Sequence, residues 1–350
     1  MKREDFGYAL PPDLIAQFPL KKREDAKLLV IDRATRQITH DVFANIGRYL
    51  PPASCLVVND SKVIPARLFG KRETGGQVEI FLLKRLADGY TYETLIKPLK
   101  KLQVNEPIYF NGGSLIAQIK DKENRLVRFN KKIIKPFLRK FGHMPLPPYI
   151  RRPDQASDRT DYQTVYAKKD GSVASPTAGL HFTKGLLAQL KRQGHTVLNV
   201  TLHVNYGTFK PVEEEDITRH RMHHEEYEVS KKSYESIQQA KTQGHPVIAV
   251  GTTACRVLET VAGDCSERSE QHSNAKHLTC PLQGNTNLFI YPGYSFKMVD
   301  CLITNFHFPY STLLMLVSAF AGHDLIMKVY REAIEKKYRF YSYGDGMLII

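Results

Sequence analysis

The sequence predicts a large α/β domain that is interrupted by a small antiparallel β-barrel domain. Apolar strands alternate with helices on both sides of residues 61–150, whereas this middle segment reads as short strands and turns alone. The middle segment also carries most of the excess positive charge. We therefore expect residues 1–60 and 151–350 to build the α/β domain, with most of the active site in the second part, and residues 61–150 to form an inserted basic barrel.

The elements of the first 150 residues follow from their apolar runs. KLLVIDR and SCLVVND, within the first 60 residues, are typical of buried strands. Five β-rich runs then follow with short turns between them: QVEIFLLKRL, YTYETLIKPL, EPIYFN, SLIAQIKD and RLVRFN. Strands at this close spacing are typical of a small barrel. The proline-rich GHMPLPPYIRRPD predicts a linker or hinge at the end of the barrel.

Strands and helices alternate after residue 151. YQTVYA is read as a strand, and the helix TKGLLAQLKRQG that follows has Thr183 as its N-cap and Gly194 as its stop. Ser230 and Ser311 open two further helices, and HDLIMKVYREAIEKKY predicts an amphipathic one near the C-terminus. TVLNVTLHV, HPVIAVG and VDCLITNFH predict strands of this domain. The polar residues 264–287 are expected to form a surface loop that is partly disordered.

The charge distribution indicates a polyanionic partner. The chain has a net charge of +14, and residues 61–150 hold 18 Lys and Arg against 7 Asp and Glu, a net of +11. Neutralising phosphates releases counterions, which favours binding of nucleic acid without regard to its sequence. The alternative is a solvated basic face that only keeps the protein in solution.

Other features limit the class of protein. The N-terminus MKREDFGYALPPDL has no apolar core of a secretory signal, and STLLMLVSAFAG is shorter than the roughly 20 residues of a membrane span. The five cysteines form no CxxC pair, which predicts neither a zinc site nor a disulfide framework and fits a reducing cytoplasm. A Cys/His site assembled from distant positions stays open as an alternative.

Four loops follow predicted strands at their carboxyl ends, where open α/β sheets bind ligands. These loops are VASPTAGLHFT, LHVNYGTFKPV, VGTTACRVLET and ITNFHFPYST. In VGTTACRVLET, the purely structural interpretation is that Thr252 or Thr253 caps a helix. A helix N-terminus also binds anions, and Arg256 one turn later would support a carboxylate or phosphate.

The segment RHRMHHEEYEVS gathers three histidines and two glutamates. His220 and His224 have the spacing of metal ligands on a helix, but the HExxH order is absent. We therefore expect a hydrogen-bonded His/Glu cluster at a polar cleft, and no metal.

Taken together, the motifs of this chain resemble one enzyme family. They include NDSKVIPARLFGKRETGGQVEIFLL, YQTVYAKKDGSVASPTAGLHFT, HVNYGTFKPV, DITRHRMHHEEYEVS, GTTACRVLET, LFIYPGYSF, LITNFHFPYSTLLMLVSAFAG and FYSYGDGMLI. The family is that of the S-adenosylmethionine:tRNA ribosyltransferase-isomerases of queuosine biosynthesis. The resemblance extends from MKREDFGYALPPDLIAQFP to the C-terminus, and it implies the same architecture of an α/β domain with an inserted barrel.

The resemblance implies a specific reaction. The ribosyl part of S-adenosylmethionine would move to the aminomethyl group of 7-aminomethyl-7-deazaguanine at the wobble position of a tRNA anticodon. Adenine and methionine would leave, and the base would become epoxyqueuosine. S-adenosylmethionine is thus a ribosyl-donating co-substrate, and no metal is required. The resemblance also implies a cytoplasmic enzyme, which we expect to be a monomer without an obligate protein partner.

The reaction needs a group that moves a proton near the ribose. His181 projects from a loop of small residues, and we expect it to be the base for the C5′ proton or the proton donor to adenine. His307 and His203 are the competing candidates, and a His181 that merely packs its loop is the structural alternative. Glu225 or Asp345 would hold the tRNA amine and accept its proton.

Other residues are expected to bind the substrates. The small-residue loop around Thr177 and Gly179 would let the backbone approach a flat ligand. Thr252, Thr253 and Arg256 would hold the methionine carboxylate. Asn305 would bridge to the ribose hydroxyls and His203 would contribute to the same site. Tyr291 and Tyr294 would stack on a base, or would simply be core aromatics.

The sequence departs from the usual family pattern at a few positions, which include Asn205, Tyr206, Tyr310, Cys255 and Gly346. None of these changes removes a His, Arg, Asn or acid from the motifs, so activity is expected. The rival interpretations are an S-adenosylmethionine-dependent RNA methyltransferase and a non-catalytic tRNA-binding protein. GTTACR lacks the glycine pattern expected of the first, and the uncharged polar loops argue against the second.

Overall fold

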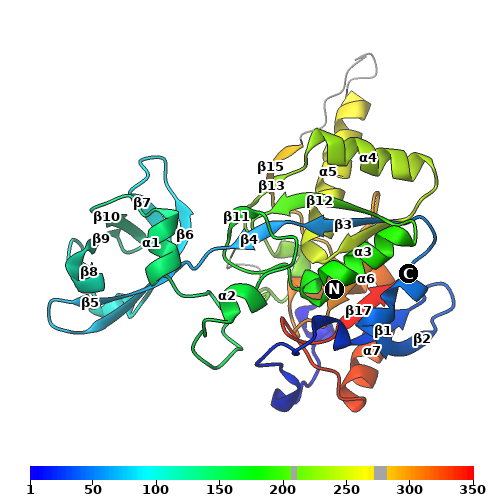
Figure 1. Ribbon diagram of the computed structural model, residues 1–350, viewed down its shortest axis with the longest axis horizontal. Coiled ribbons are helices and arrows are strands. Elements are labelled where there is room, and N and C mark those ends of the chain that lie inside the picture. The colour runs from blue at the N-terminus through cyan, green and yellow to red at the C-terminus, as the bar shows by residue number, and fades with distance from the viewer. Residues whose placement is uncertain (206–210, 272–281) are drawn as a thin grey trace.

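A nine-stranded mixed sheet forms the centre of the larger lobe of the molecule (Figure 1). The computed structural model describes residues 1–205, 211–271 and 282–350. The strand order is β15 (Gln283–Thr286), β13 (Glu225–Glu228), β12 (Thr196–Leu202), β3 (Cys55–Asn59), β14 (Val247–Val250), β16 (Cys301–Asn305), β17 (Gly346–Ile349), β1 (Lys27–Ile31) and β2 (Ile38–Val42). The four strands from β12 to β16 are mutually parallel, so their carboxyl ends lie at one edge of the sheet.

The central strands are apolar throughout because helices cover both faces of the sheet. All five residues of β3 are buried: Cys55 and Val57 face one core, and Leu56 and Val58 face the other. α3 (Lys184–Arg192) packs on the second face. The first face is covered by α4 (Lys231–Thr242), α5 (Thr252–Gln271), α6 (Thr312–Ala321) and α7 (His323–Glu335).

Three predicted N-caps are confirmed. The hydroxyl of Thr183 accepts from Leu186 N at 3.0 Å, and Ser230 and Ser311 make the equivalent bonds at the starts of α4 and α6. Each hydroxyl satisfies a backbone N–H that the first helical turn leaves without an intrahelical acceptor.

The smaller lobe is an antiparallel sheet of six strands in the order β10-β7-β6-β5-β8-β9. β9 (Leu115–Asp121) also pairs with β10 (Leu126–Phe129), so the sheet closes on itself. The other strands are β5 (Arg67–Arg72), β6 (Gln77–Arg85), β7 (Thr91–Lys97) and β8 (Pro107–Phe110). Their alternate residues, such as Ile80 and Ile108, fill a separate apolar core. The sequence predicted five of these strands and missed β5.

Two segments join the lobes. The chain enters the smaller lobe along β4 (Ser61–Val63), which pairs in parallel with β11 (Lys169–Ser172) (Figure 1). α1 (Lys135–Phe141) and α2 (Asp158–Asp161) lie on the return path. An ion pair of 2.8 Å between Lys135 and Asp170 links the two lobes.

Several expectations are corrected. YQTVYA is a turn-rich segment after α2 and not a strand. Residues 264–287 are not simply a loop, because α5 continues to Gln271 and residues 283–286 form β15; residues 272–281 lie outside the described residues. Because the residues of β15 are polar, its sequence did not predict a strand, although it pairs with β13. The cysteine spacing shows no disulfide pattern, yet Cys265 is disulfide-bonded, while Cys55, Cys255 and Cys301 are free thiols.

None of the helices in the described ranges is by itself long and apolar enough to cross a membrane. α6 and α7 meet the criteria of length and composition only as a pair, which is bent by 114°.

Candidate active site

The loops that the sequence singled out meet at the carboxyl edge of the parallel strands. Asn305 ends β16, Thr252 begins α5 directly after β14 and Gly251, and His203 follows β12. His181 ends the short 3-10 helix η7 (Thr177–His181), which packs against β16. Chain segments more than 100 residues apart thus meet at one edge of the sheet.

η7 is the centre of an inner polar cluster, by which we mean Thr164, Tyr166, Ser175, residues 177–181, Thr252, Thr253, Arg256 and Asn305. His181 Nε2 lies 3.2 Å from Asn305 Nδ2. Its ring stacks on Phe43 with ring centroids 4.7 Å apart. A Cβ at Gly251 would lie 3.6 Å from both Ala178 and Thr253, so the α5 N-terminus contacts η7 directly.

Several buried polar atoms of the inner polar cluster make no hydrogen bond with any described residue. They are Thr164 Oγ1, Tyr166 Oη, Ser175 Oγ, Thr253 Oγ1, Arg256 Nη2 and Asn305 Oδ1. Buried polar atoms in native proteins almost always have partners, because an unmade hydrogen bond in the interior costs about 1–3 kcal/mol. A concentration of such atoms at a strand-end edge is therefore expected where a polar ligand binds.

Gly179 has a structural reason to be glycine. A Cβ at this position would lie 1.9 Å from Tyr166 Oη, and its own N–H already donates to Pro176 O at 2.9 Å. Gly179 was expected to let a ligand approach the backbone closely, but in the structure the group that approaches it is the side chain of Tyr166. Direct contact of Gly179 with a ligand remains a prediction that this geometry does not favour.

Arg256 and Glu225 form a buried ion pair. Their side chains are only 4% and 2% exposed, and Arg256 Nη1 donates to Glu225 Oε2. Glu225 Oε1 accepts from Asn205 N at 2.8 Å, and Arg256 Nε donates to Leu288 O at 3.0 Å. The expected roles of these two residues, in holding the tRNA amine and the methionine carboxylate, would therefore be coupled through one pair of charges.

The histidines of the edge are neutral. Burial, together with the positive charges of Arg339 and Arg23, lowers the pKa of His181 to about 3. Burial alone lowers the pKa of His307 to about 3. His307 Nε2 lies 2.8 Å from Thr304 Oγ1. An imidazole that is neutral at pH 7 is not an imidazolium donor to adenine, so this environment disfavours the donor role, although a pKa near 3 also makes His181 a weak base.

We expect these histidines to make the fold sensitive to acid. The pKa of each histidine is lower in the folded protein than in the unfolded chain, where it is near 6.5. Below pH 6.5 the unfolded chain therefore binds more protons than the folded protein. Stability should be complete above that pH and fall as the pH drops toward 3. Each histidine should cost about 2 kcal/mol at pH 5. Urea unfolding at pH 7 and at pH 5 measures the loss of stability. The His181→Asn variant, which lacks one of these histidines, should lose less stability than the wild-type protein between pH 7 and pH 5.

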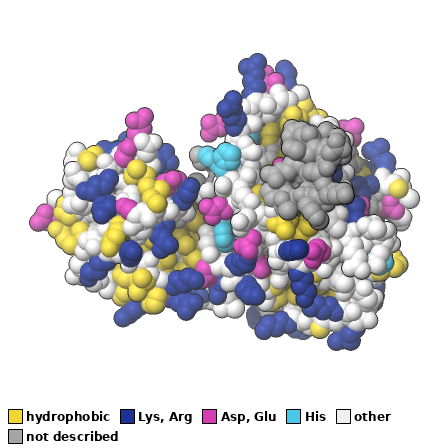
Figure 2. Space-filling model, turned by 90° about the horizontal axis from the view of Figure 1, so that it is seen from above, with side chains coloured by type: hydrophobic (Ala, Val, Ile, Leu, Met, Phe, Trp, Pro, Cys, Tyr) yellow, Lys and Arg dark blue, Asp and Glu magenta, His cyan; other side chains and the backbone are white. Residues whose placement is uncertain are grey.

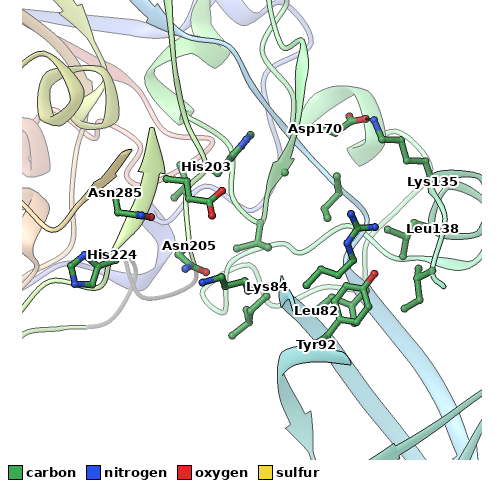
Figure 3. Close-up of a pocket in the computed structure, with 18 residues that line it drawn as sticks. Leu82, Lys84, Tyr92, Lys135, Leu138, Asp170, His203, Asn205, His224 and Asn285 are labelled. Carbon is green, nitrogen blue, oxygen red and sulfur yellow. Dashed lines mark ion pairs between the residues drawn. The ribbon is translucent and has the colours of Figure 1, made fainter. Parts of the chain in front are cut away.

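A second polar surface lies in the cleft between the two lobes. The cleft has a volume of about 490 Å³, within the range of small-molecule sites. Figure 2 shows the hollow between the lobes, with histidine and acidic side chains on the wall of the larger one. In Figure 3, His203, Asn205, His224 and Asn285 approach it from the larger lobe, and Lys84, Leu82 and Tyr92 from the barrel.

His203 is held rigidly at this cleft. Its Nδ1 lies 2.8 Å from Ser61 Oγ, and its ring packs so closely on Gly171 that a Cβ there would lie within 2.9 Å of it. Burial lowers the pKa of His203, and the negative charge of Glu226 opposes this shift. His203 thus faces the cleft, whereas His181 and Asn305 belong to the inner polar cluster.

Three of the expected residues lie in structural roles. Asp345 is 2% exposed and accepts from the backbone N–H groups of Lys27 and Arg339. Tyr294 donates to Glu259, whose carboxylate also accepts from three backbone N–H groups. Tyr291 packs against Phe289. These contacts favour the interpretation of both tyrosines as core aromatics.

The metal alternative for the histidine-rich segment loses its basis. His220 and His224 lie in extended chain before β13, so they do not share a helix face. His220 Nδ1 lies 3.0 Å from Glu214, an acid outside this segment, and Glu225 pairs with Arg256, so within the described residues His220 and Glu225 do not hydrogen-bond each other as the expected His/Glu cluster would require. Across the described ranges, no three His, Cys, Asp or Glu side chains group as metal ligands.

Sequence reasoning missed Tyr166 and Ser61, and it placed Glu226 in one His/Glu cluster together with Glu225 without separating the roles of the two acids. Tyr166 lay in a segment assigned to a strand, and Ser61 was treated only as a domain boundary. Glu226 was masked by its neighbour Glu225, although the alternation of a strand predicts that adjacent side chains face opposite ways. A strand assignment at residues 225–228 would have separated the two acids.

Three comparisons place the chain among known proteins. The model of a family described as queuosine biosynthesis protein matches residues 3–349. Relatives named S-adenosylmethionine:tRNA ribosyltransferase-isomerase, from Thermoanaerobacter sp. and Carboxydothermus hydrogenoformans, are each 48% identical over the whole of both chains. A crystal structure of an S-adenosylmethionine tRNA ribosyltransferase from Thermotoga maritima is 34% identical, with a TM-score of 0.55, and the match covers 99% of this chain and all of that one. The chain therefore belongs to the queuosine biosynthesis protein family, that of the S-adenosylmethionine:tRNA ribosyltransferase-isomerases.

Proposed function

We propose that this protein transfers and isomerises the ribosyl group of S-adenosylmethionine onto 7-aminomethyl-7-deazaguanine at the wobble position of tRNA. The products are epoxyqueuosine in the tRNA, adenine and methionine. The observation that carries this proposal is the full-length identity of 48% to relatives that bear the name of this activity. The protein would act in the cytoplasm and as a monomer.

The inner polar cluster is the proposed site for S-adenosylmethionine. Arg256 Nη2 and the Thr252–Thr253 turn would bind the methionine carboxylate, since a guanidinium at a helix N-terminus offers both charge and N–H donors. Asn305 Oδ1, buried and unpaired among the described residues, would accept from a ribose hydroxyl. Neutral His181 would take the proton from C5′, which the neighbouring sulfonium acidifies. Thr177, at the start of η7, would line this site.

Product analysis separates this function from its rivals. The protein is incubated with S-adenosylmethionine and tRNA that carries the aminomethyl base. The proposed reaction releases free adenine, whereas a methyltransferase would release S-adenosylhomocysteine and a non-catalytic binder would release neither. Release of S-adenosylhomocysteine without adenine would refute the proposal.

The barrel of residues 61–150 is proposed as an inserted domain that binds the tRNA backbone. Several of its cations are already paired: Arg67 with Glu79, Arg72 with Glu106 and Arg128 with Asp88. Lys131 and Lys132 are exposed and lie on the segment that leads to Lys135. They are therefore the cations that we expect to meet phosphates.

Replacing Lys131, Lys132 and Lys135 together by Ala should weaken tRNA binding and flatten its dependence on salt. About two or three phosphate contacts are lost, the third only where Lys135 exchanges Asp170 for a phosphate, so the log–log slope should fall by about 2–3. Filter binding between 50 and 200 mM salt measures this, and affinity for S-adenosylmethionine should stay unchanged. Asp170→Asn is the matched control, because it breaks the Lys135 pair between the lobes without removing a cation. An unaltered slope in the triple variant would place the tRNA elsewhere.

A further inference from the structure

The cleft between the lobes has two walls of different chemistry. The barrel wall combines apolar side chains, such as Leu82, Tyr92 and Ile133, with the cations Lys84, Arg85 and Lys135. The wall of the larger lobe presents His203, Asn205, His224 and Asn285 (Figure 3). Glu226 lines the same wall. A flat base can stack on an apolar wall while its polar edge and substituents meet hydrogen-bonding groups. This arrangement suits an unstacked nucleobase that carries a polar substituent.

The acids of the cleft differ in their availability. Asp170 is neutralised by Lys135 at 2.8 Å. Glu226 makes no ion pair with any residue in the described ranges. Because side chains alternate along a strand, Glu225 points inward to Arg256 and Glu226 points to the cleft. The adjacent residues Glu225 and Glu226 thus supply one carboxylate each: Glu225 to Arg256 of the inner polar cluster, and Glu226 to the cleft.

His203 lies beside Glu226. The backbone N–H of His203 donates to Glu226 O at 3.0 Å, which aligns the two residues across adjacent strands. Ser61 Oγ hydrogen-bonds Nδ1 of the imidazole. Two residues before Ser61, the side-chain amide of Asn59 donates to Leu202 O and accepts from Leu202 N, which fixes this segment beside β12. Nε2 is the remaining ring nitrogen, on a ring that lines the cleft.

On the basis of the proposed function, we propose that Glu226 and His203 form the subsite for the primary amine of the acceptor base. The Glu226 carboxylate binds the aminomethyl group as its ammonium. In the tautomer with its proton on Nδ1, where Ser61 Oγ accepts, His203 Nε2 carries a lone pair and takes one proton from the ammonium. An N–H bond of the amine breaks, an N–H bond forms on Nε2, and the neutral amine keeps the lone pair that attacks the ribosyl carbon.

This assignment gives each neighbour a definite task. The carboxylate of Glu226 stabilises the imidazolium that forms on His203, as an acid beside a catalytic histidine does. Ser61 and Gly171 are positioning residues: Ser61 selects the tautomer, and Gly171 leaves space for the ring. The modified base differs from guanine in its aminomethyl group and in the C7 that carries it, so a subsite for the amine also provides specificity for tRNA that already carries it.

The first test compares two tRNAs that differ only in the wobble base, aminomethyl-deazaguanine or guanine. Glu226→Gln should weaken binding of the aminomethyl tRNA by about tenfold to a hundredfold, as expected for a lost charge-assisted hydrogen bond, and leave guanine tRNA unchanged. Glu228→Gln is the matched control, since Glu228 lies two residues along the same strand and pairs with Lys169. Equal weakening of both tRNAs, or no weakening in Glu226→Gln, would overturn the subsite.

The second test separates chemistry from binding. His203→Asn should lower kcat for adenine release by about a hundredfold or more, and Ser61→Ala should lower kcat with KM for tRNA unchanged. A change in melting temperature without a change in kcat would show that both residues are only structural and would overturn their assigned roles. The binding comparison needs no turnover, so it tests the amine subsite even if the wild-type protein releases no adenine, an outcome that would instead refute the proposed function.

Discussion

Replacing His181 by Ala is expected to lower turnover by about 10²–10⁴-fold, the usual effect of removing a positioned base. His181 is buried, its pKa is lowered to about 3, and its Nε2 lies beside Asn305, so it enters the reaction as a neutral imidazole. Binding of S-adenosylmethionine and of tRNA should persist, because neither relies mainly on the imidazole. Steady-state adenine release, together with separate binding measurements, tests this expectation.

His181→Asn separates the chemical role from packing. Asn can still hydrogen-bond Asn305 but cannot take up a proton, so a catalytic His181 predicts that this variant stays as inactive as His181→Ala. If the ring serves only to stack on Phe43 and fill the edge, Asn should largely restore activity and Ala should lower the melting temperature. Exchange of solvent deuterium into C5′ provides a second readout. Exchange that continues in His181→Asn would transfer the role of base to another residue, with His307 the first candidate.

Arg256→Ala is expected to destabilise the fold by about 3–5 kcal/mol and to weaken S-adenosylmethionine binding by about 1.5–3 kcal/mol. The first effect arises because the variant leaves the Glu225 carboxylate buried without its cation. The second arises because the proposed carboxylate donor is lost. Urea denaturation measures stability, and calorimetry with S-adenosylmethionine measures affinity, while tRNA binding should be unaffected.

The double variant Arg256→Met, Glu225→Gln distinguishes these two effects. Removing both charges takes away the uncompensated carboxylate, so most of the stability should return. Affinity for S-adenosylmethionine should remain low, because the guanidinium is still missing. Recovery of affinity together with stability would mean that Arg256 acts only as the partner of Glu225, and a selective loss of tRNA affinity would also contradict the assignment.

The sequence predicted most elements of the fold where local chemistry decides structure. The apolar runs of β1, β3, β14 and β16 are unambiguous because both faces of these strands are buried. Thr183, Ser230 and Ser311 marked helix starts correctly because a capping hydroxyl acts within three residues of its own position. The sequence analysis missed β13 and wrongly assigned β15 to a loop, because the polar residues of both become strands only through pairing: β13 joins the sheet beside β12, and β15 pairs with β13.

For the site, the residue types and the edge of the sheet at which they gather could be predicted from the sequence. Loops after the parallel strands β14 and β16 meet at the carboxyl edge of the sheet, and so Asn305 and the start of α5 could be placed together in advance. His181 was expected there because YQTVYA was assigned to a strand, which is wrong; η7 reaches this edge by packing against β16. Tertiary structure alone decided which partners each side chain has. Glu225 pairs with Arg256 and Glu226 faces the cleft because β13 joins the sheet in one register, and Ser61 reaches His203 because two lobes are joined beside β12. Such contacts depend on distances between segments that lie far apart in the chain, and these distances exist only once the strands have paired.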